Sequence, residues 1–344
     1  MNVKSNTVPR IALFGVGNVA RRIIRFCDMK GWPVVAAYNR AGDKIGRDIG
    51  QLAGLDKNLG VHVQDCEKAD YAGLEADIML YTAGDFLSSN YPVYERFLKL
   101  GINVLCHGTQ SYNPRFENPE VADKIDRVAK ANGVTFTGTG IWDTTRLWAP
   151  IVAAGTCLTI DSVVHVANAE IGRQGAQFEA LCSGVGLTVD EYMASFIKQS
   201  TPFTLNRYVH SPVVMVLQKL GATIKEVRKY DEPIVFDTPV YSPHSKKEFP
   251  AGIVVGTRNN VEVTTEEGIV GKAILEYRLF KENEIEDLRW EINGMPGLVI
   301  SVERKDTANL SAAALFNRIP DVIAAQPGIV EITRMGPLTS TAML

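Results

Sequence analysis

The chain has 344 residues, 46% of them hydrophobic and 22% charged, and a soluble chain of this size is expected to form about two domains. A formal net charge of −3 and a pI near 6.0 give no electrostatic reason to expect nucleic acid or an anionic membrane as a partner. The five cysteines form no CxxC pair, and their odd number argues against a complete disulfide framework, so we expect a cytoplasmic protein.

Two further kinds of site are not expected. The N-terminal segment lacks the apolar core of a signal peptide, and no run approaches the roughly 18 to 20 apolar residues of a membrane span. The sequence has no HExxH motif and no other tight grouping of His, Cys and carboxylate residues. We therefore predict neither a membrane anchor nor a bound metal.

Short apolar runs alternate with helical segments from Pro9 to about Gly140. The runs are almost continuously apolar, which is typical of parallel strands covered on both faces. This alternation predicts a Rossmann-type doubly wound parallel sheet over residues 1–140. The strand candidates are RIALFG, PVVAAYN, VHVQ, ADIMLYT, INVLCH and VTFTGTG, and the helix candidates are residues 18–30, 91–100 and 118–131.

The pattern changes beyond about residue 141. Two helical stretches, near 188–199 and 206–221, precede several strand-like runs that have turn residues but no helices between them. Such runs predict a mostly antiparallel sheet, so residues 141–306 are assigned to an α+β domain. A helix over 307–325 and the tail to 344 are expected to pack back near the active site. The strand candidates of this half are AGIVVGT, VEVTT, IVGKAILEYRLFK, DLRWEING and GLVISVER.

The segment FGVGNVARR follows the first predicted strand and opens a helix. It places Gly15, Gly17 and Ala20 in GxGxxA spacing, with Asn18 and Val19 at the start of the helix. The first glycine permits a tight turn, the second lets the backbone approach a pyrophosphate, and the small third residue packs helix against strand. A structural turn is the alternative, but the strand-to-helix context favours binding of a dinucleotide cofactor.

The end of the second predicted strand indicates which dinucleotide binds. NAD sites usually carry Asp or Glu there to hold the ribose 2′-hydroxyl, whereas this chain has Asn39 and Arg40. Arg40 can pair with a 2′-phosphate and Asn39 can donate to it, so we predict a preference for NADP(H). If Arg40 is a solvated residue stacking on adenine, use of NAD(H) stays open. Thr82 and Ala83, which follow the fourth strand, are expected to contact the cofactor.

Several segments together resemble a known family. They are GTG at 138–140, SGVGLTVDEY at 183–192, VHSPVVMVLQKLG at 209–221, GIVVGT, EINGMP, and AALFNRIPDVIAAQPGIVEI at 313–332, which is the most specific. They are similar to the 2,4-diaminopentanoate dehydrogenase and native amine dehydrogenase family, whose N-terminal half is related to dihydrodipicolinate reductase. The resemblance implies a homodimeric NAD(P)-dependent oxidoreductase that moves hydride between the nicotinamide and a carbon bearing nitrogen. It also implies that Asn317 contacts the nicotinamide carboxamide or ribose.

The loop after the fifth strand, NVLCHGTQSYNP, departs from this family's pattern. Amine-forming members carry a glutamate there, because ammonium must lose a proton before attack and the carbinolamine hydroxyl must then gain one. This chain has Thr109 and Gln110, which exchange no proton near neutral pH. The local candidates for proton transfer are His107, Tyr112 and Asp143. Either His107 or Tyr112 moves the proton, or the reaction needs almost none, as with a preformed iminium.

Each candidate also has a structural interpretation. His107 can hydrogen-bond backbone within the loop, Tyr112 can pack the loop, and Asp143 can cap a helix starting near Thr144, which we favour. Glu170 and Arg173 can form a surface ion pair that contributes little to stability. The residues expected to line a substrate pocket are Trp142, Trp148, Glu170, Arg173 and His210.

Three functions therefore stay open. The first is an amine dehydrogenase or imine reductase acting on a small-molecule amine or imine. The second is an NADP-dependent carbonyl or alcohol oxidoreductase with His107 or Tyr112 as proton donor. The third is a redox-silent protein that binds NADP(H) and a small ligand to regulate a partner.

Overall fold

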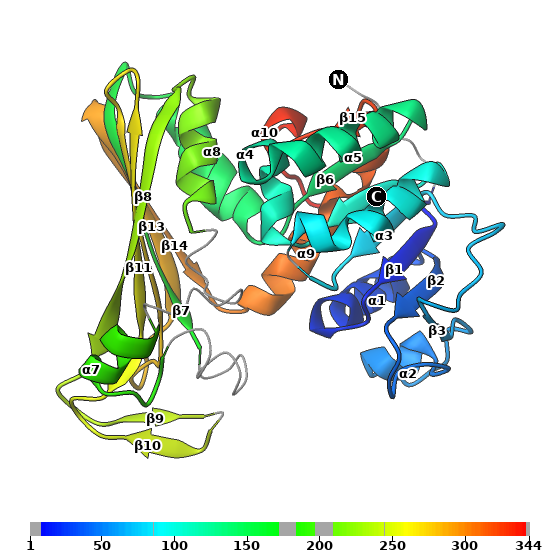
Figure 1. Ribbon diagram of the computed structural model, residues 1–344, viewed down its shortest axis with the longest axis horizontal. Helices are drawn as coiled ribbons and strands as arrows, with labels where there is room; N and C mark the ends of the chain where they lie inside the picture. The colour runs from blue at the N-terminus through cyan, green and yellow to red at the C-terminus, as the bar shows by residue number, and fades with distance from the viewer. Residues whose placement is uncertain (1–7, 85, 172–183, 197–208, 244, 342–344) are drawn as a thin grey trace. The chain divides into compact units, whose positions relative to one another are not determined.

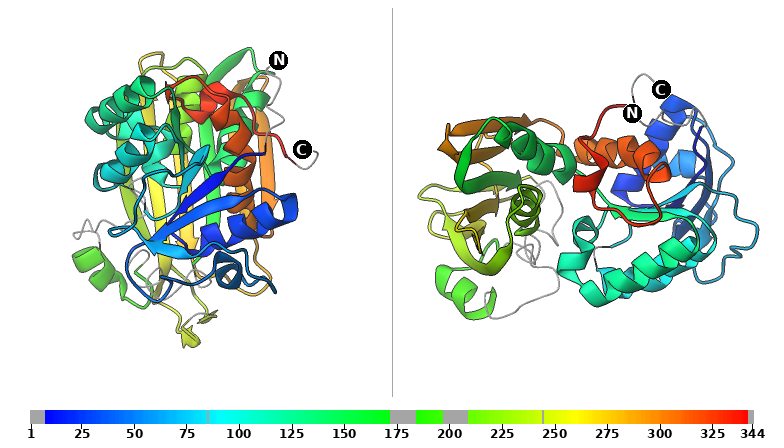
Figure 2. Two further views of the ribbon diagram at one scale, coloured as in Figure 1. Left: turned by 90° about the vertical axis from the view of Figure 1, so that its right-hand side faces the viewer. Right: turned by 90° about the horizontal axis from the view of Figure 1, so that it is seen from above.

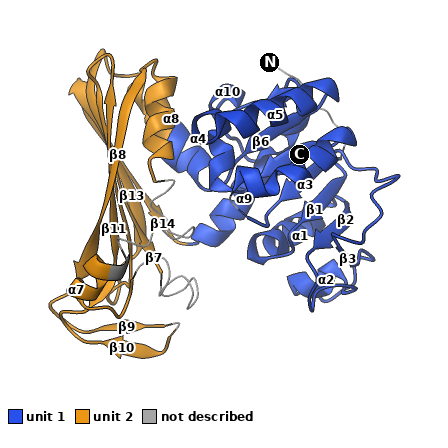
Figure 3. Cartoon of the chain, viewed as in Figure 1, with its two compact units in different colours: residues 1–148, 306–344 blue, residues 149–305 orange. Residues whose placement is uncertain are grey.

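The computed structural model describes residues 8–84, 86–171, 184–196, 209–243 and 245–341 (Figure 1). The chain divides into two compact units (Figure 3): unit 1 contains residues 1–148 and 306–344, and unit 2 contains residues 149–305. The chain thus passes from one unit to the other twice. The first passage lies eight residues beyond the predicted boundary at 140 and the second lies one residue before the predicted boundary at 306, while the C-terminal segment belongs to unit 1.

Unit 1 contains a seven-stranded sheet in the order β15-β6-β5-β4-β1-β2-β3, and all its strand pairs are parallel. The strand order reverses between β1 and β4, and ligands of such sheets bind beyond the carboxyl ends of the strands at this point. The predicted Rossmann-type sheet is confirmed. Its strands are β1 Ile11–Phe14, β2 Val34–Asn39, β3 Val63–Asp65, β4 Ile78–Tyr81, β5 Asn103–Cys106, β6 Thr135–Gly138 and β15 Gly328–Ile329.

Helices cover both faces of this sheet (Figure 2). Successive residues of a strand point to opposite faces, and in β1 both sets are apolar: Ala12 and Phe14 pack with α3 and α5, while Ile11 and Leu13 pack with α1, α2 and α9. This explains the continuously apolar runs in the sequence. The helices are α1 Asn18–Lys30, α2 Ile49–Ala53, α3 Leu87–Lys99, α4 Pro114–Glu117, α5 Pro119–Ala131, α9 Thr307–Ile323 and α10 Ile332–Met335.

Unit 2 contains a six-stranded sheet in the order β14-β13-β7-β12-β11-β8, in which only β7 and β12 pair in parallel. The predicted mostly antiparallel sheet is confirmed. Helix α8 (Ser211–Lys219) packs on one face so closely that a Cβ at Gly271 would lie 2.5 Å from Val213 and 2.8 Å from Leu217. The other elements are α6 Ala149–Ala154, β7 Thr159–Glu170, α7 Val189–Glu191, β8 Ile224–Val235, β9 Val240–Ser242, β10 Lys247–Phe249, β11 Val254–Thr265, β12 Val270–Arg278, β13 Glu286–Met295 and β14 Leu298–Arg304.

Several predicted elements of unit 2 differ from the structure. The two strand candidates 251–257 and 261–265 belong to one strand, β11, and neither β7 nor β8 was predicted. The helix predicted over 188–199 begins as α7 and continues as the π-helix η4 (Tyr192–Phe196), beyond which it leaves the described residues.

Among the helices that the structure describes, none is long and apolar enough to cross a membrane.

Candidate functional site

The turn between β1 and α1 is held closely against the loop after β4. Gly15 has a φ of 91°, and its N–H donates to the carbonyl oxygen of Tyr38 at 2.8 Å. A Cβ at Gly15 would lie 2.8 Å from the Cβ of Ala83, so both the backbone angle and the packing require glycine. The Thr82 hydroxyl donates to the carbonyl oxygen of Gly15 at 2.6 Å. Thr82 and Ala83 thus shape the turn in which a dinucleotide would bind.

The backbone of Gly17, two residues after Gly15, has open space beside it. A Cβ added to Gly17 would have no other atom within 4 Å, so a ligand can approach this backbone. Gly17 is the N-cap residue of α1 and has no side chain with which to cap the first N–H groups, while Ala20 is fully buried against the sheet. An uncapped helix N-terminus attracts anions. The residues present therefore fit the pyrophosphate of a dinucleotide.

The two predicted cofactor residues at the end of β2, Asn39 and Arg40, have different surroundings. The Oδ1 atom of Asn39 accepts from the N–H of Val16 at 3.2 Å, and its Nδ2 donates to the carbonyl oxygen of Arg40 at 3.0 Å. Asn39 thus supports the glycine turn, and its donation to a 2′-phosphate stays a prediction. Arg40 is exposed.

The loop after β5 carries His107 and continues as the 3-10 helix η1 (Thr109–Tyr112). The backbone N–H of His107 donates to the carbonyl oxygen of Tyr81 at 2.9 Å, and its Nε2 lies 2.8 Å from the Oγ of Ser311 in α9. The Oε1 atom of Gln110 accepts from the N–H of Leu87, the first residue of α3, at 2.8 Å. Gln110 is therefore a helix cap.

The two glycines of the GTG segment at the end of β6 have no room for a side chain, because residues of η1 pack against their backbone. A Cβ at Gly138 would lie 2.2 Å from the Oγ of Ser111, and a Cβ at Gly140 would lie 2.2 Å from the Tyr112 hydroxyl and 3.3 Å from the Nε2 of His107. The Tyr112 hydroxyl and the His107 imidazole therefore lie side by side over Gly140. The ring of Tyr112 is 5.1 Å from that of Trp142, so the structure brings three of the predicted site residues together.

Asp143 has neither of its predicted roles. It is fully buried and forms a bidentate ion pair with the buried Arg318 of α9, at 2.6 Å and 2.9 Å, while the Thr139 hydroxyl donates to it at 2.6 Å. Burial raises the pKa of the Asp143 carboxyl above its ordinary value, and the ion pair and the Thr139 hydrogen bond oppose that rise. Because both oxygens are engaged, Asp143 is a structural anchor. It neither caps a helix at Thr144 nor stands ready as a proton donor.

The remaining residues are divided between the units. In unit 1, Trp148 is buried, and the Oδ1 atom of Asn317 accepts from the N–H and hydroxyl of Thr341, so Asn317 holds the C-terminal tail. In unit 2, the carboxylate of Glu170 is buried and accepts from the N–H of Phe280 at 2.9 Å, so Glu170 is not part of a surface ion pair. His210 is buried at the start of α8, and Arg173 lies outside the described residues.

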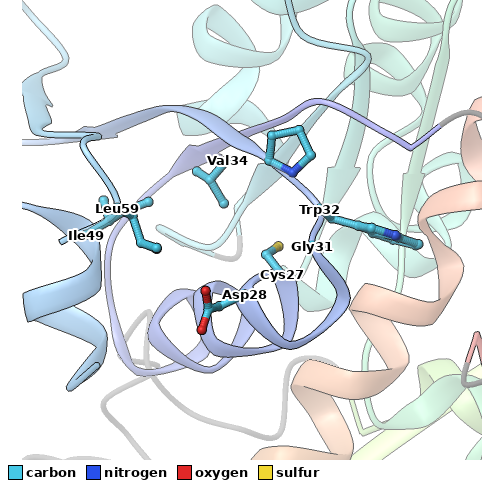
Figure 4. A pocket seen from close by; sticks show the side chains of 8 residues that line it. Cys27, Asp28, Gly31, Trp32, Val34, Ile49 and Leu59 are labelled. Atoms are coloured by element: carbon cyan, nitrogen blue, oxygen red, sulfur yellow. The ribbon is translucent and has the colours of Figure 1, made fainter. Parts of the chain in front are cut away.

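A cavity of about 200 Å³ lies elsewhere in unit 1 (Figure 4). It opens at the amino end of β2 and the carboxyl end of α1, whereas a dinucleotide is expected at the opposite end of the strands. This cavity is therefore not the cofactor site. Its lining residues are Cys27, Asp28, Gly31, Trp32, Pro33, Val34, Ile49 and Leu59.

A parallel sheet with an open glycine turn at its switch point, and with a histidine and a tyrosine in the loop after β5, defines a dinucleotide-binding enzyme of the Rossmann class. The comparisons with known proteins narrow this class. The model of the 2,4-diaminopentanoate dehydrogenase C-terminal domain matches residues 151–343. The chain therefore belongs to the 2,4-diaminopentanoate dehydrogenase family and is an NAD(P)-dependent oxidoreductase.

Individual relatives agree with this assignment. A 2,4-diaminopentanoate dehydrogenase from Acetoanaerobium sticklandii is 27% identical over 268 residues, which are 74% of this chain and 72% of the relative. The amine dehydrogenase from Mycobacterium smegmatis superposes with a TM-score of 0.84 at 27% identity, over 98% of both chains. GenD2 from gentamicin A biosynthesis, solved in complex with NAD, shares the fold at a TM-score of 0.52 and 13% identity, over 88% of this chain and 75% of its own.

Proposed function

We propose that this protein is an NADP(H)-preferring oxidoreductase that interconverts a small imine and its amine, and that it accepts the imine preformed. The observation that carries the proposal is the hydrogen bond from the N–H of Leu87 to the amide oxygen of Gln110. At Thr109 and Gln110, where the family resemblance implies a glutamate, this chain has no carboxylate, and the Gln110 side chain instead accepts from the first N–H of α3. The segment 107–112 contains no Asp or Glu.

The chemistry explains why this favours a preformed imine. Proton transfer by a positioned side chain contributes roughly 10²- to 10⁴-fold, which is about 3 to 5 kcal/mol of barrier. Joining ammonium to a ketone needs this contribution twice. An iminium carbon accepts hydride without proton transfer, because the π electrons of the C=N bond become the lone pair on nitrogen. The nicotinamide, when bound, supplies that hydride, and a neutral imine needs one proton from the protein.

The preference for NADP(H) is supported by the end of β2. Residues 38–42 contain no carboxylate that would repel a 2′-phosphate, and Arg40 is exposed there. A guanidinium pairs with a phosphate through two parallel hydrogen bonds. We expect kcat/KM to favour NADPH over NADH in the wild type and Arg40→Asp to reverse the order. A wild type that prefers NADH would refute this part of the proposal.

The substrate class is tested by following NADPH consumption with a cyclic imine, with a ketone plus ammonium, and with the ketone alone. We expect the cyclic imine to be reduced fastest. Fastest reduction of the ketone alone would instead identify a carbonyl oxidoreductase, and silence with all three would favour the redox-silent binding protein.

The role of position 109 is tested by Thr109→Glu, with Thr109→Gln as a control of the same size that exchanges no proton. If the missing glutamate accounts for weak amination, the Glu variant alone should gain turnover with ketone plus ammonium, by at least tenfold. Equal amination by both variants would contradict the account.

We also propose a homodimer that associates through the unit 2 sheet. On the face of this sheet opposite α8, the cross-strand neighbours Val166 and Ile274, together with Val164, are half-buried apolar residues. Light scattering after size-exclusion chromatography should give twice the chain mass of 37.7 kDa. A single-chain mass would refute the dimer.

A further inference from the structure

We propose that Ser311 is a positioning residue, which holds the His107 imidazole so that His107 can exchange a proton with the substrate. The proposal rests on the proposed function and deepens it, since it decides between His107 and Tyr112. It begins from the 2.8 Å contact between the Nε2 of His107 and the Oγ of Ser311. These two residues are 204 positions apart in sequence.

The exposure of the two rings indicates which of them reaches the substrate. Tyr112 is 3% exposed and packs against Trp142, whereas His107 is half-buried. The hydroxyl of Tyr112 and the Nε2 of His107 approach the same point over Gly140. Tyr112 therefore supports the imidazole from within the protein, and His107 is the member of the pair that can meet a ligand.

The residue that contacts the Nε2 of the imidazole is itself held in place. Ser311 is buried in α9, whose N-terminus is capped by Asp306 through its hydrogen bond with the N–H of Asn309 at 3.1 Å. Seven residues along the same helix face, Arg318 binds the buried Asp143. The part of α9 that carries Ser311 is therefore held by Asp306 at one end and by Arg318 at the other.

A hydroxyl suits this position chemically. It donates to a neutral imidazole nitrogen and accepts from an imidazolium N–H, so the contact persists in either charge state. When a neutral imine is reduced, the Nδ1–H bond of the His107 imidazolium breaks as the N–H bond of the amine forms, since Nε2 is held by Ser311, and the one proton consumed is then replaced from solution. Removal of the hydroxyl would take away one contact that orients the imidazole, and small displacements of an oriented group reduce rates strongly.

The test compares Ser311→Ala with Ser311→Thr, which keeps the hydroxyl. With NADPH and a cyclic imine, we expect Ser311→Ala to lower kcat about tenfold with little change in KM, and Ser311→Thr to restore most of the loss. His107→Gln should lower kcat by about 10²-fold or more. The double variant should be no slower than His107→Gln, because both changes impair the same proton transfer by His107. Additive losses, or an unchanged kcat in Ser311→Ala, would overturn the proposal.

A second readout does not depend on turnover. The imidazole resonances of the five histidines are titrated by NMR, and His107→Gln assigns the resonance of His107. Ser311→Ala should shift the midpoint and the tautomer-sensitive nitrogen shifts of His107, and Ser311→Thr should not. If the wild type reduces none of the substrates, the proposed function fails. The NMR comparison still decides whether Ser311 holds His107, since identical titrations of wild type and Ser311→Ala would refute it.

Discussion

The loops that follow β1 and β5 leave the same edge of one parallel sheet, yet they are built in opposite ways. At Gly17, after β1, a side chain would enter empty space. In the loop after β5, the His107 imidazole and the Tyr112 hydroxyl already fill the space beside the backbone of Gly140, which follows β6. In the loop after β1, the space beside the backbone is open to a ligand. The loop after β5 is a set of side chains already positioned by packing, with α9 holding both His107 and Asp143.

The largest effect on stability is expected at the ion pair between Asp143 and Arg318 of α9. Asp143→Ala leaves the Arg318 guanidinium buried without its main partner, and breaking a buried pair in this way costs about 3 to 5 kcal/mol. We expect the free energy of unfolding, measured with urea, to fall by that amount. Glu75→Ala is the control, because Glu75 is exposed where it pairs with Arg10 and such pairs contribute at most about 1 kcal/mol. Equal losses in the two variants would contradict the anchor.

An intermediate effect is expected at Gly140. In Gly140→Ala the new methyl group would overlap the Tyr112 hydroxyl, and overpacking of this kind costs about 1 to 3 kcal/mol. Because His107 borders the same point, turnover should fall with stability, while NADPH affinity should stay near that of the wild type. A stable variant with full turnover would show that the loop after β5 adjusts easily, and the contrast between the loops would disappear.

The smallest effect on stability is expected at Gly17. The Cβ of Gly17→Ala meets no other atom, and with φ at −96° the change should leave the melting temperature unchanged or slightly raised. The methyl group would occupy the space predicted for the pyrophosphate, so NADPH affinity should fall by about tenfold, equivalent to about 1.4 kcal/mol. Isothermal titration calorimetry measures the affinity, and unchanged binding would mean that the cofactor does not approach this turn.

The sequence predicted the parallel sheet well because apolar burial on both faces leaves a continuous pattern. It failed for β8, a strand at the sheet edge with charged side chains. The polar residues that interrupt the apolar pattern of β11 are also those that hold β8: Asn259 donates to Asp231 at 2.6 Å, and Asn260 donates to Glu232 at 3.0 Å. Cross-strand pairs of this kind become visible only when the register is known.

The site was predictable to a similar extent. The GxGxxA spacing is local, so the glycine turn could be predicted from sequence, and so could the positions of His107 and Tyr112 after a strand. Ser311 and Arg318 could not be assigned in this way, because their partners are 204 and 175 residues away. One signal was present: Ser311 and Arg318 are seven residues apart in the helix, and the other buried residues of α9 are apolar.

The two passages of the chain between the units give unit 2 the character of an insertion. The segments that flank it, η2 (Asp143–Trp148) and α9, are joined by the Asp143–Arg318 ion pair, and within unit 2 the first helix, α6, packs against the last strand, β14. Entry and exit are thus neighbours on each side, as in domains that tolerate insertion or exchange. A different unit could therefore replace residues 149–305 without rebuilding the parallel sheet of unit 1.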